Sequence, residues 1–268
     1  MAIFKYELRQ MRGLILGGVI AFSVLLFCLL PPYISITTNP DGSARTETLA
    51  TVDGNSFLQA VDISAEFLSK PIGMYGFLTG WFFGLALAVI AMHIGLSIHT
   101  KEYMQGTADF LLTKPHNRTK IFISKLFAAA VAVLSIGVAY FLASLVSLNI
   151  FAAGFDFKLF VLLACSIILN SVLFMSFGFF LGTILPKIRK SIFTSVITLF
   201  ITIIIGTMAQ VTGADILIFL SPPKYFGGSI VADMGGYDMR YVVWLIFLVI
   251  AFTLVGSFIY RKKDVVIR

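Results

Sequence analysis

The chain has 268 residues, of which 59% are hydrophobic and only 12% charged, and its formal net charge is +7 at neutral pH. Soluble domains are close to half apolar and a quarter charged, so this composition excludes an ordinary soluble domain and indicates a membrane protein. The basic excess could suggest nucleic-acid binding, but the Lys and Arg residues lie where membrane topology requires them, so we expect no nucleic-acid partner.

We predict an all-α polytopic membrane protein in which residues 1–268 form a single transmembrane domain. A helix of about 20 apolar residues crosses a bilayer, and the chain has six runs of that kind. In chain order they are Leu14–Ile34, Gly73–His99, Ile121–Ile150, Lys158–Leu185, Ile192–Gln210 and Tyr241–Tyr260. The first run is too long for a signal peptide and no small-residue cleavage site follows closely, so we expect it to be retained.

The distribution of basic residues predicts the orientation of these spans. With the N-terminus in the cytoplasm, 15 of the 20 Lys and Arg residues fall in inner segments and five in outer segments. Lys and Arg are enriched in cytoplasmic connections. We therefore expect both termini in the cytoplasm.

Two outer connections are long enough to have structure of their own. The first, Ser35–Ile72, is opened by the pair Pro31-Pro32. The second, residues 211–240, is predicted to be a re-entrant segment with a short helix, a proline break and a second short element. Irregular backbone at membrane depth must be buried in protein.

The sequence lacks the motifs of common catalytic and metal sites. No Gly-Lys dipeptide is present, so the phosphate-binding loop of ATPases is missing, and no metal-ligand grouping surrounds His93, His99 or His116. We expect no catalytic residue, no metal and no cofactor bound by this chain. His93 is the one clearly intramembrane ionisable side chain, and we expect a neutral imidazole bonded to a neighbouring helix rather than a functional site.

The connection after the second span, residues 100–118, has the features of a short helix lying across the cytoplasmic face. Gly106 breaks the descending helix and Thr107 can cap the next one. Phe110, Leu111 and Leu112 form an apolar ridge bracketed by charges, as a docking element on a cytosolic partner would. The alternative is an amphipathic helix resting on lipid headgroups.

This connection resembles the signature of type-2 ABC transporter permeases, also called type V exporters. The matching pattern is Glu102-x3-Gly106-Thr107, followed by Leu111-Leu112-x2-Pro115-x2-Arg118-x2-Ile121-x3-Lys125. Three weaker features agree: an amphipathic start at residues 1–13, the stretch Ser221-Pro222-Pro223-Lys224-Tyr225-Phe226, and the ending Tyr260-Arg261-Lys262-Lys263-Asp264. His116 and Asn117 depart from the commoner residues of the signature.

The resemblance implies a role for each segment. Residues 1–13 would be the connecting helix, with Lys5, Glu7 and Arg9 as its site residues. The coupling helix would contact the ATPase through Glu102, Gly106, Thr107, Phe110, Leu111, Leu112 and Arg118. The expected partners are two cytosolic ABC ATPase subunits, which bind ATP and Mg, a second permease copy or paralogue, and membrane lipids. We expect a multi-pass protein of a bacterial cell membrane that works as an exporter.

Small residues on the spans suggest either packing or a transport route. Ser195, Thr198 and Thr202 recur at helical spacing on the fifth span and could line the path, or could bond a neighbouring helix. Gly76, Gly80 and Gly84 on span two, with Gly178 and Gly182 on span four, permit close helix approach within the chain or between subunits.

The rival functions are a secondary carrier or channel not driven by ATP, and a membrane enzyme. Ion-coupled carriers usually keep acidic side chains near the midplane, and this chain has none there. The missing catalytic motifs oppose the enzyme.

Overall fold

The computed structural model describes residues 2–37, 67–68, 72–104, 106, 117–152 and 154–262, and no strand occurs among them. The helices are α1 (Ala2–Thr37), α5 (Gly73–Leu78), the π-helix η1 (Thr79–Gly84), α6 (Leu85–Met104), α8 (Arg118–Phe151), α9 (Phe157–Ile184), α10 (Ser191–Thr212), α11 (Asp215–Ile218), the 3₁₀ turn η2 (Pro222–Lys224), α12 (Gly228–Met234) and α13 (Met239–Lys262). Helices α5, η1 and α6 follow one another without a gap as one span. Within the described residues, six helical spans are long and apolar enough to cross a membrane, as predicted.

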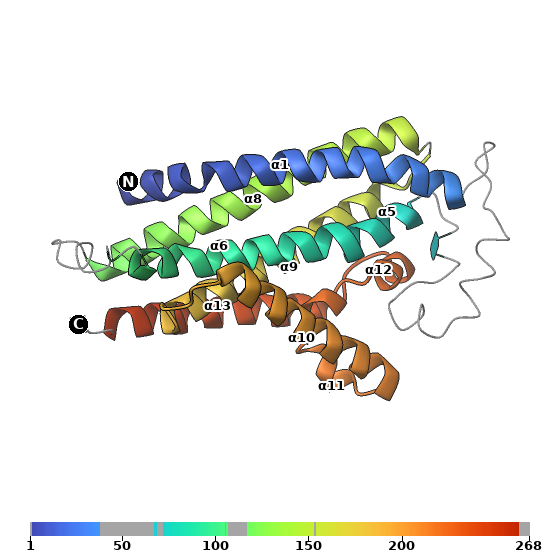
Figure 1. Ribbon diagram of the computed structural model, residues 1–268. Helices are drawn as coiled ribbons and strands as arrows, with labels where there is room; N and C mark the ends of the chain where they lie inside the picture. Colours follow the sequence, from blue (N-terminus) through green and yellow to red (C-terminus); the bar gives the residue numbers. More distant parts are fainter. Residues whose placement is uncertain are drawn as a thin grey trace.

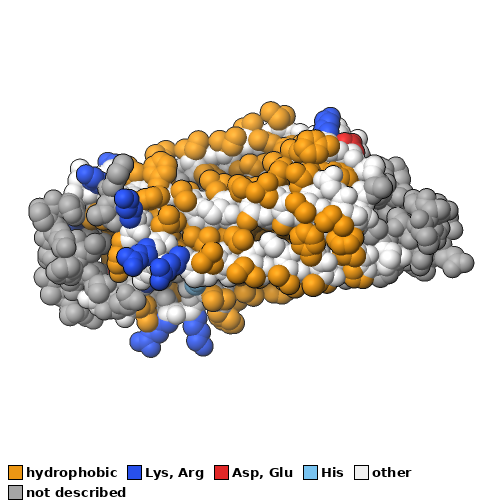
Figure 2. All heavy atoms as spheres, turned by 90° about the horizontal axis from the view of Figure 1, so that it is seen from above, with side chains coloured by type: hydrophobic (Ala, Val, Ile, Leu, Met, Phe, Trp, Pro, Cys, Tyr) orange, Lys and Arg blue, Asp and Glu red, His pale blue; other side chains and the backbone are white. Residues whose placement is uncertain are grey.

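These segments are helical because a bilayer offers no hydrogen-bond partners, so each span must satisfy its own backbone groups. Large apolar side chains remain exposed along all six spans, for example Leu142, Phe200 and Leu254. Figure 2 shows them as a belt along the body, with Lys and Arg gathered toward one end. That pattern is what a protein surrounded by lipid requires.

The long helices run side by side and form one bundle (Figure 1). Helix α1 packs chiefly on α8, and α6 packs chiefly on α9, with α13 against α9 and α10 against α6. Both ends of the described chain lie at the same end of the bundle, which we call the basal end. The short elements α11, η2 and α12 lie toward the other, distal end, and we call residues 213–238, which contain them, the distal segment.

Helix α1 is longer than the first predicted span in both directions. Residues 2–13 are helical and continue into the span without a break, and the helix also contains Pro31 and Pro32, which were expected to open the loop. Each proline removes one backbone hydrogen bond. They lie in the last two turns of α1, where few hydrogen bonds remain to be lost, so the helix persists to Thr37.

The packing of α6 on α9 depends on glycines. A Cβ atom added to Gly178 would lie 2.3 Å from the Met92 carbonyl oxygen, and one added to Gly95 would lie 2.2 Å from the Met175 carbonyl oxygen. Gly182 similarly approaches Leu96. The small residues of span four therefore pack within the chain, which was one of the two possibilities.

Candidate functional site

Four charged side chains from three helices meet near the basal end: Glu7, Lys101, Glu102 and Lys125, which we call the basal ion cluster. Lys101 Nζ donates a hydrogen bond to the Glu7 carboxylate. Lys125 Nζ lies 2.5 Å from Glu102 Oε1 and donates to the Ile98 carbonyl at 3.1 Å. The cluster thus joins α1, α6 and α8 through two ion pairs.

Two members of the basal ion cluster are almost completely buried, Glu7 at 1% and Lys125 at 0% exposure. A buried charge without a partner costs several kcal/mol, so these side chains can stay ionised only because each has an opposite charge beside it. The acids and lysines are equal in number. The cluster therefore fixes the last turn of α6 to α1 and α8.

The chain changes direction just beyond this cluster. Helix α6 ends at Met104, and Gly106 has a φ of +67°, a left-handed conformation that glycine adopts readily. The predicted helix break at Gly106 is therefore observed. The basal ion cluster lies directly before the break.

The start of α8 is held in two ways. The Asn117 side chain accepts a hydrogen bond from the Thr119 backbone N–H at 3.1 Å, as the predicted cap should. Arg118 Nη1 donates to the Arg261 carbonyl at 3.2 Å and so contacts the end of α13. The two helices that bracket the predicted coupling segment are therefore anchored to the rest of the bundle.

The structure places the predicted coupling residues unevenly. Glu102 lies in the basal ion cluster, Gly106 at the break after α6, and Arg118 at the start of α8. The other predicted coupling residues, Thr107, Phe110, Leu111 and Leu112, lie outside the described residues. On the N-terminal segment Lys5 and Arg9 are exposed, whereas Glu7 is buried in the cluster. The structure therefore brings Glu7 and Glu102 into one site, although the sequence suggested separate sites for them.

Lys101 and Lys125 are the residues of the basal ion cluster that the sequence analysis did not select. Lys125 appeared only as the last position of the family signature. Its signal was available, because it is a lysine within the apolar run of the third span, and it corrects the expectation that His93 is the one clearly intramembrane ionisable side chain. A charged side chain there needs a partner.

The predicted bond from His93 to a neighbouring helix is observed. The Nδ1 atom of His93 lies 3.0 Å from Ser191 Oγ, so the ring bonds to α10, a neighbouring helix.

No group of three or more His, Cys, Asp or Glu side chains able to hold a metal occurs in the described part of the chain.

The three predicted path residues lie on α10 but bond within it. Ser195 is fully buried, while Thr198 and Thr202 line a pocket of about 220 Å³ between α9, α10, α13 and the distal segment. Their hydroxyls donate to carbonyls of α10 itself, at 2.8 to 2.9 Å. These three hydroxyls therefore do not donate hydrogen bonds to a neighbouring helix, which was the alternative prediction.

The small-residue face of α10 continues to Gly206 for a packing reason. A Cβ atom there would lie 2.2 Å from Ser221 Oγ and 2.7 Å from Lys224 Cγ. Gly206 therefore makes room for the distal segment.

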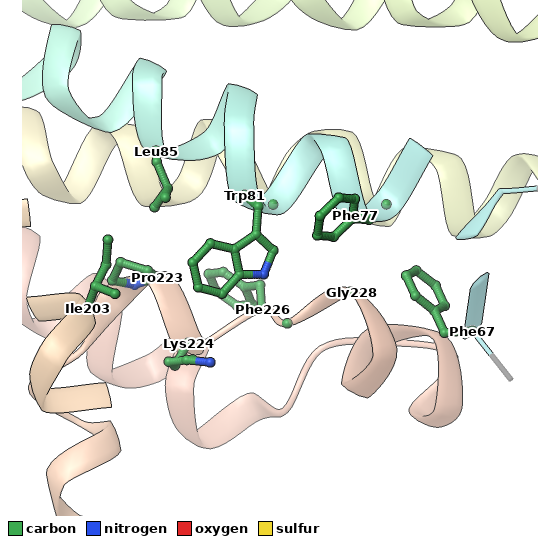
Figure 3. A pocket seen from close by; sticks show the side chains of 12 residues that line it. Phe67, Phe77, Trp81, Leu85, Ile203, Pro223, Lys224, Phe226 and Gly228 are labelled. Atoms are coloured by element: carbon green, nitrogen blue, oxygen red, sulfur yellow. The ribbon is translucent and has the colours of Figure 1, made fainter. Parts of the chain in front are cut away.

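A second pocket, of about 50 Å³, lies between η1, α10 and the distal segment (Figure 3). Lys224 is nearly buried there, and its Nζ donates to Gln210 Oε1 at 2.8 Å and lies 5.5 Å from the centroid of the Trp81 ring. Phe77 and Phe226 also line this pocket. It is an aromatic pocket that contains a cation.

Two phenols hold the distal segment in place. Tyr225 donates to the Phe219 carbonyl and Tyr237 to the Leu162 carbonyl of α9, both at 2.5 Å. Burial raises the pKa of both phenols, so both remain protonated and able to donate throughout the physiological pH range. The distal segment is thus bonded to itself and to α9.

Comparison with known families decides the class. The family model described as "ABC-2 family transporter protein" matches residues 1–265, almost the whole chain. The chain belongs to the ABC-2 transporter family. No curated protein matches it. Members of this family are membrane permeases of ABC transporters and generally partner with ATPase subunits, and the six apolar helices agree that the chain is a multi-pass membrane protein.

Proposed function

We propose that this ABC-2 permease is the membrane subunit of an ATP-driven exporter, with the basal end in the cytoplasm of a bacterial cell. In this proposal two permease subunits, identical or paralogous, work with two ATPase subunits that hold ATP and Mg. The segment between α6 and α8 couples them. The permease pair forms the route for the cargo, with Ser195, Thr198 and Thr202 on it.

The basal ion cluster is the observation that supports this proposal most strongly. It ties the last turn of α6 to α1 and α8, and Gly106 follows it at once. A displacement of the segment beyond Gly106 would therefore move three helices together. That is the mechanical property that a coupling segment needs.

The charge distribution supports the proposed orientation. Among the described Lys and Arg residues, all but Lys158, Lys224 and Arg240 belong to segments at the basal end. Figure 2 shows the basic side chains concentrated there. Basic residues favour the cytoplasmic side of a membrane.

Truncation of the apolar ridge tests the coupling role. We expect the double variant Phe110→Ala, Leu111→Ala to lose most of its co-purifying ATPase, because buried apolar anchors at an interface each contribute about 1 to 4 kcal/mol. Its melting temperature in detergent should stay close to that of the unmodified chain. The measurement is the ratio of ATPase to permease after affinity purification.

The matched control is Ile123→Ala, Phe127→Ala, which removes similar apolar surface from exposed positions of α8. It should retain the ATPase. Retention by both double variants would show that the ridge rests on lipid headgroups and does not couple.

A further inference from the structure

The pocket lined by Thr198 and Thr202 differs chemically from the pocket of Figure 3. No Lys, Arg, Asp, Glu or His lines it, and its walls are formed by aromatic and aliphatic side chains of α9, α13 and the distal segment, such as Phe174, Leu248 and Phe252. We call it the α10–α13 pocket. Lys224, the nearest cation along the chain, lines the other pocket (Figure 3).

The polar atoms in the wall of the α10–α13 pocket are already bonded inside the protein. Thr198 and Thr202 donate to carbonyls of their own helix at 2.9 and 2.8 Å. Tyr225 and Trp244 donate to the same acceptor, the Phe219 carbonyl, at 2.5 and 3.0 Å. A ligand that needs hydrogen-bond donors from this wall would have to break these bonds, whereas an apolar ligand would not.

The volume limits what can enter. Dry apolar cavities of about 150 Å³ are known to bind a molecule of the size of benzene. The α10–α13 pocket has about 220 Å³. It can therefore hold the end of a hydrocarbon chain, but not a whole lipid.

The position of the pocket indicates where its ligand comes from. It lies between α10 and α13, and both spans carry exposed apolar side chains. Ile201 on α10 is 52% exposed and Phe247 on α13 is 55% exposed. Thr202, Leu248 and Phe252 are themselves only half-buried. The pocket therefore borders the hydrocarbon layer, in which lipid-like molecules already reside.

We propose that the α10–α13 pocket binds the hydrocarbon chain of a lipid-like amphiphile, and that this amphiphile is the class of cargo that the permease exports. The inference rests on the proposed function, because it names the substrate class for the same transport route. Thr198 and Thr202, which the sequence suggested for the path, then contribute wall surface rather than hydrogen bonds. Specificity for the cargo would come from the shape of its hydrocarbon chain.

The test uses the permease–ATPase complex in lipid nanodiscs and a fatty acid with a photoactivatable diazirine at the end of its chain. We expect cross-links to peptides of α9, α10 and α13 that line the pocket, and a dose-dependent rise in ATP hydrolysis. Thr198→Leu fills the pocket and should reduce both effects about tenfold, the factor that corresponds to about 1.4 kcal/mol of overpacking. Thr212→Leu, at the exposed end of α10, is the control and should leave both unchanged.

Each alternative result has a separate meaning. Cross-links spread over the lipid-facing surface, or unaffected by Thr198→Leu, would overturn the binding site. Pocket cross-links without any change in ATP hydrolysis would show a resident lipid and overturn the cargo assignment. Cross-linking does not need ATP, so pocket cross-links in a chain that binds no ATPase would refute the proposed function while the binding site stood. If Thr198→Leu does not fold, Leu248→Ala enlarges the pocket and should strengthen the pocket cross-links.

Discussion

At the scale of single residues, the ion pair of Lys125 and Glu102 shows how this membrane protein accommodates buried charges near the basal end of its helix bundle. Lys125 is fully buried, and its ammonium group is held between a carboxylate and the Ile98 carbonyl. Removing one partner of a buried pair leaves the other without compensation, which is more costly than removing both.

We expect Lys125→Met to destabilise the permease by about 3 to 5 kcal/mol, because the half-buried Glu102 carboxylate would lose the ammonium group that compensates its desolvation. The double variant Lys125→Met, Glu102→Gln should recover part of the loss. Lys120→Met, at an exposed lysine in the first turn of α8, is the control and should have little effect. Thermal unfolding in detergent measures all three, and a single variant as stable as the unmodified chain would rule out the ionised pair.

The sequence predicted the local features of this region but not the cluster. The break at Gly106, the cap at Asn117 and the bond from His93 to a neighbouring helix follow from chemistry within a few residues or from the cost of burying a polar group. The pairing of Glu7 with Lys101 joins positions 94 apart in the chain. Such a contact depends on which helices become neighbours, and one sequence does not contain that information.

At the scale of elements, five of the six spans were predicted to within a few residues because hydrophobic length is a strong signal, whereas α1 begins well before the predicted start at Leu14. For Gly76, Gly80 and Gly84, by contrast, the regular spacing did not predict which glycines make close contacts. Residues Thr79–Gly84 form a π-helix, whose wider turn changes which side chains share a face. Gly76 contacts Phe67, whereas Gly80 has open space beside it and lines the pocket of Figure 3.

Replacing a glycine by alanine should lower the stability of the protein at the contact between α6 and α9, but not at an open position of α1. Gly178→Ala should destabilise the protein by about 1 to 3 kcal/mol, because the added methyl group meets the Met92 backbone and the helices must separate. Gly17→Ala on α1 has nothing within 4 Å and should be neutral or stabilising by up to about 1 kcal/mol. Melting temperatures measured side by side decide this, and equal shifts would contradict the close approach.

At the scale of the whole molecule, the account depends on orientation. In a background in which Cys28 and Cys165 are replaced, Asp233→Cys on the distal helix α12 should react with a membrane-impermeant thiol reagent on intact cells. Lys120→Cys at the basal end should react only after the cells are opened. Both positions are exposed, so accessibility does not distinguish them. The reverse labelling pattern would place the termini outside and remove the coupling segment from the cytoplasm.

The central claim is that a separate ATPase drives this permease, and ATP hydrolysis by the purified protein tests it most directly. The tagged chain is purified once from cells that produce it alone and once from its native cells, together with any ATPase subunit that it binds there. We predict no hydrolysis by the chain alone, and ATP hydrolysis by a stable complex that the Phe110→Ala, Leu111→Ala variant fails to form. Purification without any bound ATPase and with background hydrolysis in both preparations would contradict the account and favour a carrier or channel that does not use ATP.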